Sequence, residues 1–284
     1  MSPSPVSNVS DTARWVAVYR ARESARPDAL FRDPYADRLA GDQGRAIASL
    51  MPSQARNGWP MVARTLLIDQ RVAEALERGC DCVLNLAAGL DTRPYRLDLP
   101  ASLRWIEADL PALLAEKEGL LADATPRCRL SRIAVDLTDA VARARALDQA
   151  LGGSSRALVI TEGLLVYLDA DEVRALSKSL LERPQVGTWI IDLASPAVLA
   201  RLRRGMGRHL ANAPMKFAPP EGLAFFEALG WTAEGAFSLL HTAARHRRLP
   251  WPLQLASLLP QPNPRRLGHA NWAGVVQLGR PGKR

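Results

Sequence analysis

Short apolar runs alternate with segments of helical spacing through the middle of the chain. Five such runs cover residues 83–86, 103–109, 128–137, 156–161 and 187–193. Segments of helical spacing follow three of them, at 110–121, 139–151 and 170–181. Strands that alternate with helices at this spacing predict crossover units and a mostly parallel sheet, and therefore an α/β fold.

The two ends of the chain carry different patterns. Three segments of helical spacing precede the first apolar run, at 11–24, 34–50 and 60–78. Beyond residue 193, two helical patterns lie near 197–210 and 220–229. Two strand patterns follow, near 231–239 and 272–278. Because only a helical excursion separates these last two strands, we expect them to pair as a hairpin at one edge of the sheet, which brings the expected strands to seven.

The composition is that of a globular protein. With 284 residues, 48% of them hydrophobic, the chain can bury a sizeable core. No stretch approaches the roughly 18 consecutive apolar residues of a membrane span, and the polar start MSPSPVSNVSDT lacks the apolar region of a signal peptide. We therefore expect a cytoplasmic protein without a membrane partner. Three cysteines favour neither a thiolate zinc site nor a disulfide framework.

The net charge of +8 belongs to the last third of the chain. Residues 196–284 carry a net charge of +10, and the residues before them carry −2. Basic clusters lie at 201–208, 244–248 and 264–266. This pattern indicates either a solvated basic surface or attraction of an acidic substrate or partner. Nucleic acid is not expected as a partner, because aromatic residues are not interleaved with the clusters.

The first apolar run ends in a turn of small residues, Ala87-Ala88-Gly89. Such a turn lets a ligand approach the backbone at the carboxyl end of a strand, where open α/β sheets bind ligands. Three later strands end in an acid, at Asp109, Asp136 and Glu162. Asp109 lies about twenty residues beyond the turn, where an acid can accept hydrogen bonds from ribose hydroxyls. The Asp136-Leu137 pair is suited to an adenine ring.

No phosphate-binding motif accompanies this turn. Both Gly-x-Gly-x-x-Gly and Gly-x-x-x-x-Gly-Lys-Ser/Thr are absent from the sequence, so a dinucleotide or triphosphate has no obvious cradle. A nucleoside without phosphate fits better. S-adenosylmethionine is such a ligand, and its carboxylate requires a fixed cation.

At this point the chain resembles a known family, that of the leucine carboxyl methyltransferases and polyketide O-methyltransferases, most closely its bacterial small-molecule branch. The matching segments appear in family order over residues 10–192. They are SDTARWVAVYRARES (10–24), DALFRDPYADRLA (28–40), ARTLLID (63–69), NLAAGLDTRPYRL (85–97), IEADLP (106–111), VDLTD (135–139) and TEGLLVYL (161–168). The resemblance implies a Rossmann-like class I methyltransferase: a mostly parallel seven-stranded sheet with helices on both faces and a helical substrate lid.

The resemblance also implies a division of the chain and a set of cofactor contacts. Residues 1–78 would form a helical lead-in and part of the lid, and residues 79–284 the core, with substrate-region insertions in 194–270. The implied contacts to S-adenosylmethionine are Arg22, Arg64, Ala87, Ala88, Gly89, Asp91, Asp109, Leu110, Asp136, Leu137 and Glu162.

Within this set the resemblance gives each group a role. Arg64 would hold the cofactor carboxylate, as suits a planar, permanently charged guanidinium. The 87–91 segment would line the methionine side, Asp109 would bind the ribose, and Asp136 with Leu137 would contact the adenine. Glu162 would form the pocket floor near the methionine end. Arg22 belongs to a segment whose basic residue helps to close the site.

One position departs from the family pattern. Many members have glycine where this chain has Ala87. If the backbone there requires a positive φ, alanine costs about 1 kcal/mol and weakens cofactor affinity without abolishing it. If the position requires only a small side chain, the change is neutral.

The expected reaction is in-line methyl transfer to an oxygen of a small metabolite, and an acidic metabolite is one option. The main contribution of the enzyme would be to align the acceptor oxygen, the methyl carbon and the sulfur. A carboxylate acceptor needs no base, whereas a hydroxyl gains from one. The candidate bases are Tyr167, His209 and His241. No metal is expected, because the histidines lack metal-ligand spacing.

Four other functions stay open. They are a nicotinamide oxidoreductase, a nucleic-acid methyltransferase, a methyltransferase directed at a carrier protein, and a non-catalytic S-adenosylmethionine-binding descendant. The first lacks its glycine fingerprint, and the second lacks an Asn/Asp-Pro-Pro-Tyr-like motif after the fourth strand, where this chain has Thr161-Glu162-Gly163. The oligomeric state and the identity of the acceptor are not encoded in these motifs.

Overall fold

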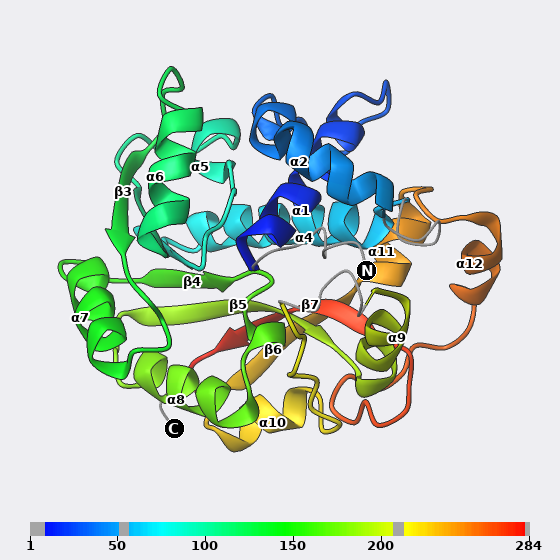
Figure 1. The fold of residues 1–284 in the computed structure, drawn as a ribbon. Coiled ribbons are helices and arrows are strands. Elements are labelled where there is room, and N and C mark those ends of the chain that lie inside the picture. Colours follow the sequence, from blue (N-terminus) through cyan, green and yellow to red (C-terminus); the bar gives the residue numbers. More distant parts are fainter. Residues whose placement is uncertain (1–8, 51–56, 207–212, 282–284) are drawn as a thin grey trace.

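A seven-stranded sheet crosses the molecule (Figure 1). The computed structural model describes residues 9–50, 57–206 and 213–281. The strand order is β3-β2-β1-β4-β5-β7-β6. The first five strands are parallel, and β7 is antiparallel to both of its neighbours, β5 and β6. The strands are β1 (Cys82–Leu86), β2 (Arg104–Asp109), β3 (Arg129–Ala134), β4 (Ala157–Thr161), β5 (Val186–Ala194), β6 (Thr232–Ser238) and β7 (Ala273–Gly279).

Alternate residues of the central strands belong to two different hydrophobic cores, as the period of two in a strand requires. In β1 and β4, Leu84 and Val159 belong to one core and Val83 and Leu158 to the other. Both strands are buried along their whole length. This explains why their sequences are nearly continuous apolar runs, interrupted in β1 by the buried Asn85, rather than alternating ones.

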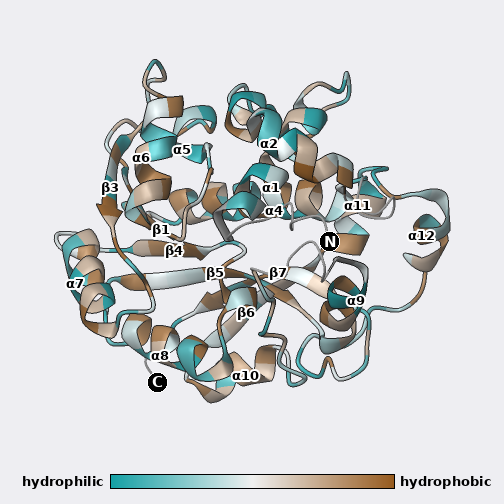
Figure 2. Cartoon of the chain, in the orientation of Figure 1, coloured by the Kyte–Doolittle hydropathy of each residue, from teal (hydrophilic) through white to brown (hydrophobic). Residues whose placement is uncertain are grey.

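Helices cover both faces of the sheet. On one face lie α4 (Trp59–Glu77) and α11 (Leu239–Arg245), which share a core with Val83. On the other face lie α7 (Ala140–Leu151), α8 (Ala170–Leu181) and α10 (Leu223–Ala228), which share a core with Leu84. In Figure 2, α7 and α8 show mixed hydrophobic and hydrophilic colour, as expected for helices with one buried face.

Seven further helical segments lie in the described residues. They are α1 (Val9–Ser24), α2 (Ala36–Leu50), α5 (Arg93–Arg96), α6 (Pro111–Leu120), the 3₁₀ turn η1 (Leu165–Tyr167), α9 (Pro196–Met206) and α12 (Trp251–Ala256). A third core joins α1 and α2 to the loop after β1 and to α6. In Figure 1, α1 and α2 lie together at the top of the view, and α9 and α12 lie at the right, opposite α6 and α7.

The structure confirms the predicted fold class and most of the predicted elements. The late strands β6 and β7 pair at the sheet edge as expected. The third strand is shorter than predicted, because Asp136 accepts hydrogen bonds from Thr138 in a turn that ends the extended backbone. The short helices α5 and α12 were not predicted individually.

The lead-in segment contributes directly to the core. Helix α4 places Ala63, Leu67 and Ile68 against the sheet residues Val83 and Ile190. The proposed division of the chain at residue 78 stays a prediction. Helix α4, which precedes that residue, packs in the same hydrophobic core as the sheet. None of the described helices is long and apolar enough to span a membrane.

Candidate functional site

A cavity of about 1430 Å³ lies along the carboxyl ends of the parallel strands. Its wall begins at the loop after β3, passes the ends of β2, β1, β4 and β5, and reaches the start of β7. Since β7 is antiparallel, its first residues lie at the same edge. A pocket for one drug-sized ligand is typically about 300–1,000 Å³. This cavity therefore has room for two small molecules side by side.

The turn after β1 brings backbone to the cavity. Ala87 has a φ of 53° and Gly89 a φ of 50°, so both residues are in the left-handed region. A Cβ at position 89 would lie 3.3 Å from the Cβ of Ala13 on α1, so α1 closes over the turn at a distance that favours glycine there. Ala87, Ala88 and Gly89, the three turn residues assigned to the cofactor from the sequence, all line the cavity.

Asp109 is held at the end of β2 by two backbone donors. The N–H of Gly89 donates to its Oδ2 at 2.6 Å, and the N–H of Leu110 donates to its Oδ1 at 2.7 Å. Burial raises the pKa of the Asp109 carboxyl above its ordinary value, although the two N–H groups act against the rise. Both oxygens keep a lone pair for further donors. Asp109 and the half-exposed Leu110 line the same part of the wall.

Asp136 and Leu137 extend this wall beyond β3. Asp136 is exposed, and its Oδ1 accepts hydrogen bonds from the backbone N–H of Thr138 at 2.9 Å and from its hydroxyl at 2.7 Å. These bonds lower the pKa of the Asp136 carboxyl. The residue thus presents a fixed carboxylate beside the partly buried Leu137.

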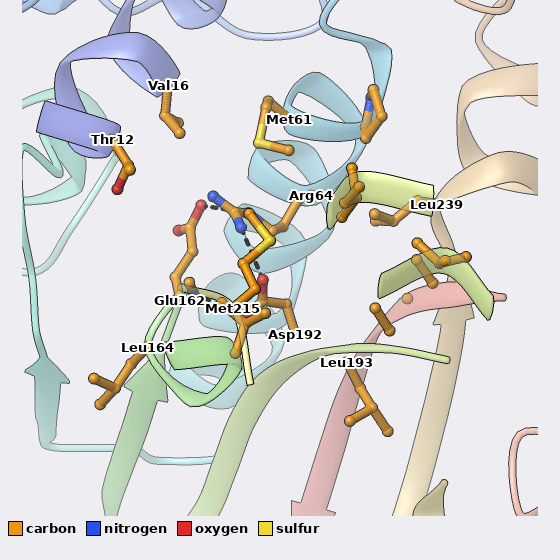
Figure 3. A pocket seen from close by; sticks show the side chains of 18 of the residues that line it. Thr12, Val16, Met61, Arg64, Glu162, Leu164, Asp192, Leu193, Met215 and Leu239 are labelled. Carbon is orange, nitrogen blue, oxygen red and sulfur yellow. Dashed lines mark hydrogen bonds and ion pairs between the residues drawn. The ribbon is translucent and has the colours of Figure 1, made fainter. Parts of the chain in front are cut away.

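Arg64 joins two carboxylates in the middle of the cavity wall (Figure 3). Its Nε donates to Glu162 at 3.0 Å, and its Nη1 donates to Asp192 at 2.8 Å. The other oxygen of Asp192 accepts the backbone N–H of Gly163 at 2.8 Å. Burial favours the neutral form of Arg64, but the two carboxylates outweigh it and raise the pKa of the guanidinium. Among the described residues, Nη2 makes no hydrogen bond and is available for a further acceptor.

A second arginine, Arg93, donates a hydrogen bond to the other carboxylate oxygen of Glu162. Arg93, which is almost fully buried, bonds Asp69 at 2.7 Å and both Asp91 and Glu162 at 2.8 Å. Burial disfavours the charged form of Asp91, but the adjacent Arg93 outweighs it and holds the pKa of Asp91 well below its ordinary value. Arg96 completes the set with two bonds to Asp69. The DTRPYR motif therefore builds a charged network beneath the cavity floor.

The structure does not bring Arg22 to the cavity wall. Arg22 is exposed and lies over the ring of Tyr19, 5.5 Å from its centroid. Arg20 lines the cavity instead, and it bonds Asp33 at 2.8 Å and the carbonyl of Leu90 at 2.6 Å. Two residues along an α-helix correspond to about 200° of rotation, so Arg20 and Arg22 lie on opposite faces of α1.

Two of the three candidate bases lie on the cavity wall, and the third, His209, lies outside the described residues. The hydroxyl of Tyr167 is 3.4 Å from the hydroxyl of Thr12, and burial raises the pKa of this phenol. A proton is therefore harder to remove from Tyr167 than from an exposed tyrosine. The Nδ1 of His241 lies 3.2 Å from the hydroxyl of Ser238 at the end of β6.

Two arginines of the last third form ion pairs within the described residues. Arg248 is buried and bonds Glu23 and Asp28 at 2.8 and 2.9 Å. Arg265 bonds Glu227 at 2.9 Å. Arg248 thus neutralises acids outside the last third, whereas Arg265 pairs with an acid inside it.

Asp192 is the main site residue that sequence reasoning missed. It lies in β5, in the segment GTWIIDL, and it follows the same pattern of an acid near a strand end as Asp109 and Glu162. The sequence pattern alone could therefore have identified Asp192 as a candidate. Its partnership with Arg64, 128 residues away in sequence, could not be predicted. Within the described ranges, no cluster of His, Cys, Asp and Glu side chains has the grouping of a metal site.

Comparison with known proteins assigns the chain to a family. The family model for leucine carboxyl methyltransferases matches residues 13–181. A Frankia alni protein named "Putative S-adenosyl-L-methionine-dependent methyltransferase" is 33% identical over 257 residues, which cover 85% of this chain and 88% of that protein. A Streptomyces coelicolor protein of the same name is 32% identical over 247 residues, covering 80% and 84%.

Solved structures agree on the fold. A DUF574 family protein of Streptomyces avermitilis superposes with a TM-score of 0.61 at 18% identity, covering 95% of this chain and 97% of that one. A crystal structure from Thermobifida fusca, titled a "putative methyltransferase", gives 0.60 at 16% identity, covering 98% and 96%. With a family match over more than half of its length and relatives above 30% identity that cover more than two thirds of it, the chain belongs to the leucine carboxyl methyltransferase family.

Proposed function

We propose that the protein is an S-adenosylmethionine-dependent methyltransferase that transfers a methyl group to an oxygen of a small molecule. The observation that carries the proposal is the geometry around Asp109. A buried carboxylate at the end of the second strand is held by the N–H of Gly89, the turn residue at the end of the first. This is the arrangement that binds a ribose in open α/β folds.

The residues present fit the cofactor along its length. Asp109 would accept both ribose hydroxyls, and Asp136 with Leu137 would contact the adenine. The Nη2 of Arg64, which has no partner among the described residues, would bind the cofactor carboxylate. Ala87, Ala88 and Gly89 line the cavity without bulky side chains, so the cofactor would approach the backbone of this turn. When bound, S-adenosylmethionine supplies an electrophilic methyl group on a sulfonium.

The charges of the cavity floor suit a cationic sulfonium. The connected network around Arg64 contains three arginines and four carboxylates, and so carries one net negative charge. These groups are Arg64, Arg93, Arg96, Asp69, Asp91, Glu162 and Asp192. Because all seven are fixed by hydrogen bonds, the field is preorganised and costs no reorientation during the reaction.

The chain's contribution to the reaction is alignment and exclusion of water. Helices α1 and α4 and the residues around α12 enclose the cavity from the side opposite the sheet. An oriented pair of reactants gains several kcal/mol from proximity alone. Where the acceptor is a hydroxyl, His241 and Tyr167 are the base candidates that line the cavity within the described ranges, and burial makes the phenol of Tyr167 harder to deprotonate.

The experiment is calorimetric titration of the purified protein with S-adenosylhomocysteine, with NAD as the control ligand. We expect binding of the adenosyl ligand and none of NAD. Asp109→Ala should weaken binding about a hundredfold, since it removes two hydrogen bonds to a charged acceptor worth about 1.5 kcal/mol each. Asp42→Ala, at a fully exposed position on α2, is the matched control and should bind as the wild type does.

Failure of the folded wild-type protein to bind S-adenosylhomocysteine would contradict the proposal. Equal weakening in Asp109→Ala and Asp42→Ala would contradict the role of Asp109. Binding without turnover of any oxygen acceptor would favour the non-catalytic descendant.

A further inference from the structure

We propose that Asp192 is a positioning residue of the cofactor site: it orients Arg64 so that Nη2 faces the cofactor carboxylate, and the protein thereby selects adenosyl ligands that keep their amino-acid end. This inference rests on the proposed function and deepens it. Asp192 is not among the cofactor contacts that the resemblance implies, and it acts on the ligand through its bond to Arg64.

The sheet brings Asp192 to the helix that carries Arg64. Side chains of a strand alternate between the two faces of a sheet, so Asp192 lies on the same face as Ile190. Ile190 packs in one core with Ala63 and Leu67, the neighbours of Arg64 on α4. The pairing of β5 with β4 and β7 fixes the position of Asp192 along its strand. Packing of the backbone therefore holds this carboxylate opposite the arginine.

Arg64 is held at two of its three guanidinium nitrogens (Figure 3). Glu162 accepts from Nε at 3.0 Å, and Asp192 accepts from Nη1 at 2.8 Å. Because a guanidinium is planar and its donors point in fixed directions, bonds at two nitrogens determine where the third one points. The bond to Glu162 alone would leave the group able to turn about that contact. Asp192 is thus the second anchor that gives Nη2 one direction.

The backbone fixes Asp192 in turn. Its Oδ1 accepts the N–H of Gly163 at 2.8 Å, and Gly163 has a φ of 69°, which favours glycine. A Cβ at position 163 would lie 3.5 Å from Nη1 and 3.8 Å from Nη2 of Arg64. A larger side chain there would cover this part of the guanidinium. Arg64, Gly163 and Asp192 all line the cavity, so the anchored group lies where a ligand can reach it.

The amino-acid end of the cofactor is a zwitterion, with one ammonium and one carboxylate. A negative charge at position 192 attracts the first and repels the second, so its direct Coulomb effects on the ligand oppose each other. The hydrogen bond from Nη2 to the carboxylate has no such opposing contribution, and it is strong only when the donor points at the acceptor. The direction of Nη2 is therefore the main route by which Asp192 affects binding.

Asparagine at position 192 removes the second anchor at nearly constant volume. Asp192 accepts from two donors, the N–H of Gly163 and the Nη1 group of Arg64. An asparagine amide has one acceptor oxygen, and its NH₂ group only donates, so one of the two donors would lose its acceptor. The N–H of Gly163 is fixed by the chain, whereas the Arg64 side chain can turn. Arg64 should therefore be the group that loses its partner.

The experiment compares two ligands by calorimetric titration of the purified full-length chain. S-adenosylhomocysteine carries the amino-acid end, and 5′-methylthioadenosine has the same adenine, ribose and thioether without it. The wild type should bind S-adenosylhomocysteine at least about tenfold more tightly, because a hydrogen bond between charged groups changes affinity about tenfold to a hundredfold. Asp192→Asn should lose most of this preference and should bind 5′-methylthioadenosine as the wild type does.

Two further variants test the route of the effect. Asp136→Asn changes the proposed contact to the adenine, which both ligands share, so it should weaken both by the same factor. Arg64→Gln should remove the preference by itself. Adding Asp192→Asn to Arg64→Gln should then produce no further loss, because the effects of two residues that act through one contact do not add.

Four results would overturn the inference. They are a wild type that binds both ligands equally tightly, unchanged binding of S-adenosylhomocysteine to Asp192→Asn, equal loss of both ligands in that variant, and an undiminished effect of Asp192→Asn in the Arg64→Gln background. In each of them the wild type still binds S-adenosylhomocysteine, so the proposed function stands. A folded wild type that binds neither ligand rejects the proposed function and the inference with it.

Discussion

The substitution Ala87→Gly tests the strain in the turn that cradles the proposed cofactor. Ala87 has a φ of 53°, and it is one of two described residues other than glycine with a positive φ. The left-handed region places Cβ close to the following carbonyl oxygen and costs a non-glycine residue about 1–2 kcal/mol. Glycine adopts this conformation without that cost.

The expected gain follows from two opposing contributions. Removing the methyl group relieves about 1.5 kcal/mol of strain, the middle of that range. Glycine also makes the unfolded chain more flexible, which costs about 0.4–1 kcal/mol. The net effect is an increase of about 0.8 kcal/mol in the free energy of unfolding.

The neighbouring alanine supplies a control in the same turn. Ala88 is 6% exposed and is absent from the described residues of positive φ. Ala88→Gly therefore relieves no strain, and it should lower the free energy of unfolding by about 0.5–1 kcal/mol through the entropy of the unfolded chain. The two adjacent substitutions should thus change stability in opposite directions.

Urea unfolding followed by circular dichroism measures both variants, and the midpoints are compared at equal slope. Titration with S-adenosylhomocysteine accompanies it, and Ala87→Gly should bind at least as tightly as the wild type. A fall in stability for Ala87→Gly, or equal falls for both variants, would refute the assignment of strain to position 87.

Three further outcomes are expected. Lys117→Met should lower the free energy of unfolding by about 1.5–3 kcal/mol, because buried Glu107 loses the ammonium 2.6 Å away and keeps only the Arg132 guanidinium at 3.0 Å; urea unfolding measures this, and near-neutrality would contradict it. Arg93 holds the pKa of Asp91 low despite burial, so the folded chain binds fewer protons there than the unfolded chain. Stability from this group is complete above about pH 4 and is lost as the pH falls further, and Asp91→Asn should flatten that part of the stability profile. Arg22→Ala should change the dissociation constant for S-adenosylhomocysteine by no more than about twofold, because Arg22 does not line the cavity. A tenfold weaker dissociation constant, measured by calorimetry, would instead support the role in closing the site that the resemblance implied.

The sequence predicted the strands of the parallel sheet closely. Runs such as 83–86 and 156–161 are mostly apolar and do not alternate, because both faces of β1 and β4 are buried, as is typical of strands inside a parallel sheet. The small-residue turn and the acids at strand ends were equally visible, since the carboxyl ends of parallel strands must share one edge.

Partnerships between distant side chains required the tertiary structure. Arg64 and Asp192 are 128 residues apart, and Arg248 and Glu23 are 225 apart. From the sequence, Arg64 was expected to bind only the cofactor carboxylate, and attraction of an acidic substrate was one explanation of the basic last third. The composition of a segment does not show which groups its charged side chains contact.

The sequence by itself thus determined the α/β fold, the strand ends and the small-residue turn on which the proposed cofactor site rests. Only the tertiary structure decided that Arg20 rather than Arg22 reaches the cavity and that Asp192 completes the centre around Arg64. The physical reason is the separation along the chain over which each interaction acts. Period and turn chemistry act between neighbours in the chain, whereas burial and ion pairing depend on elements that only packing brings together.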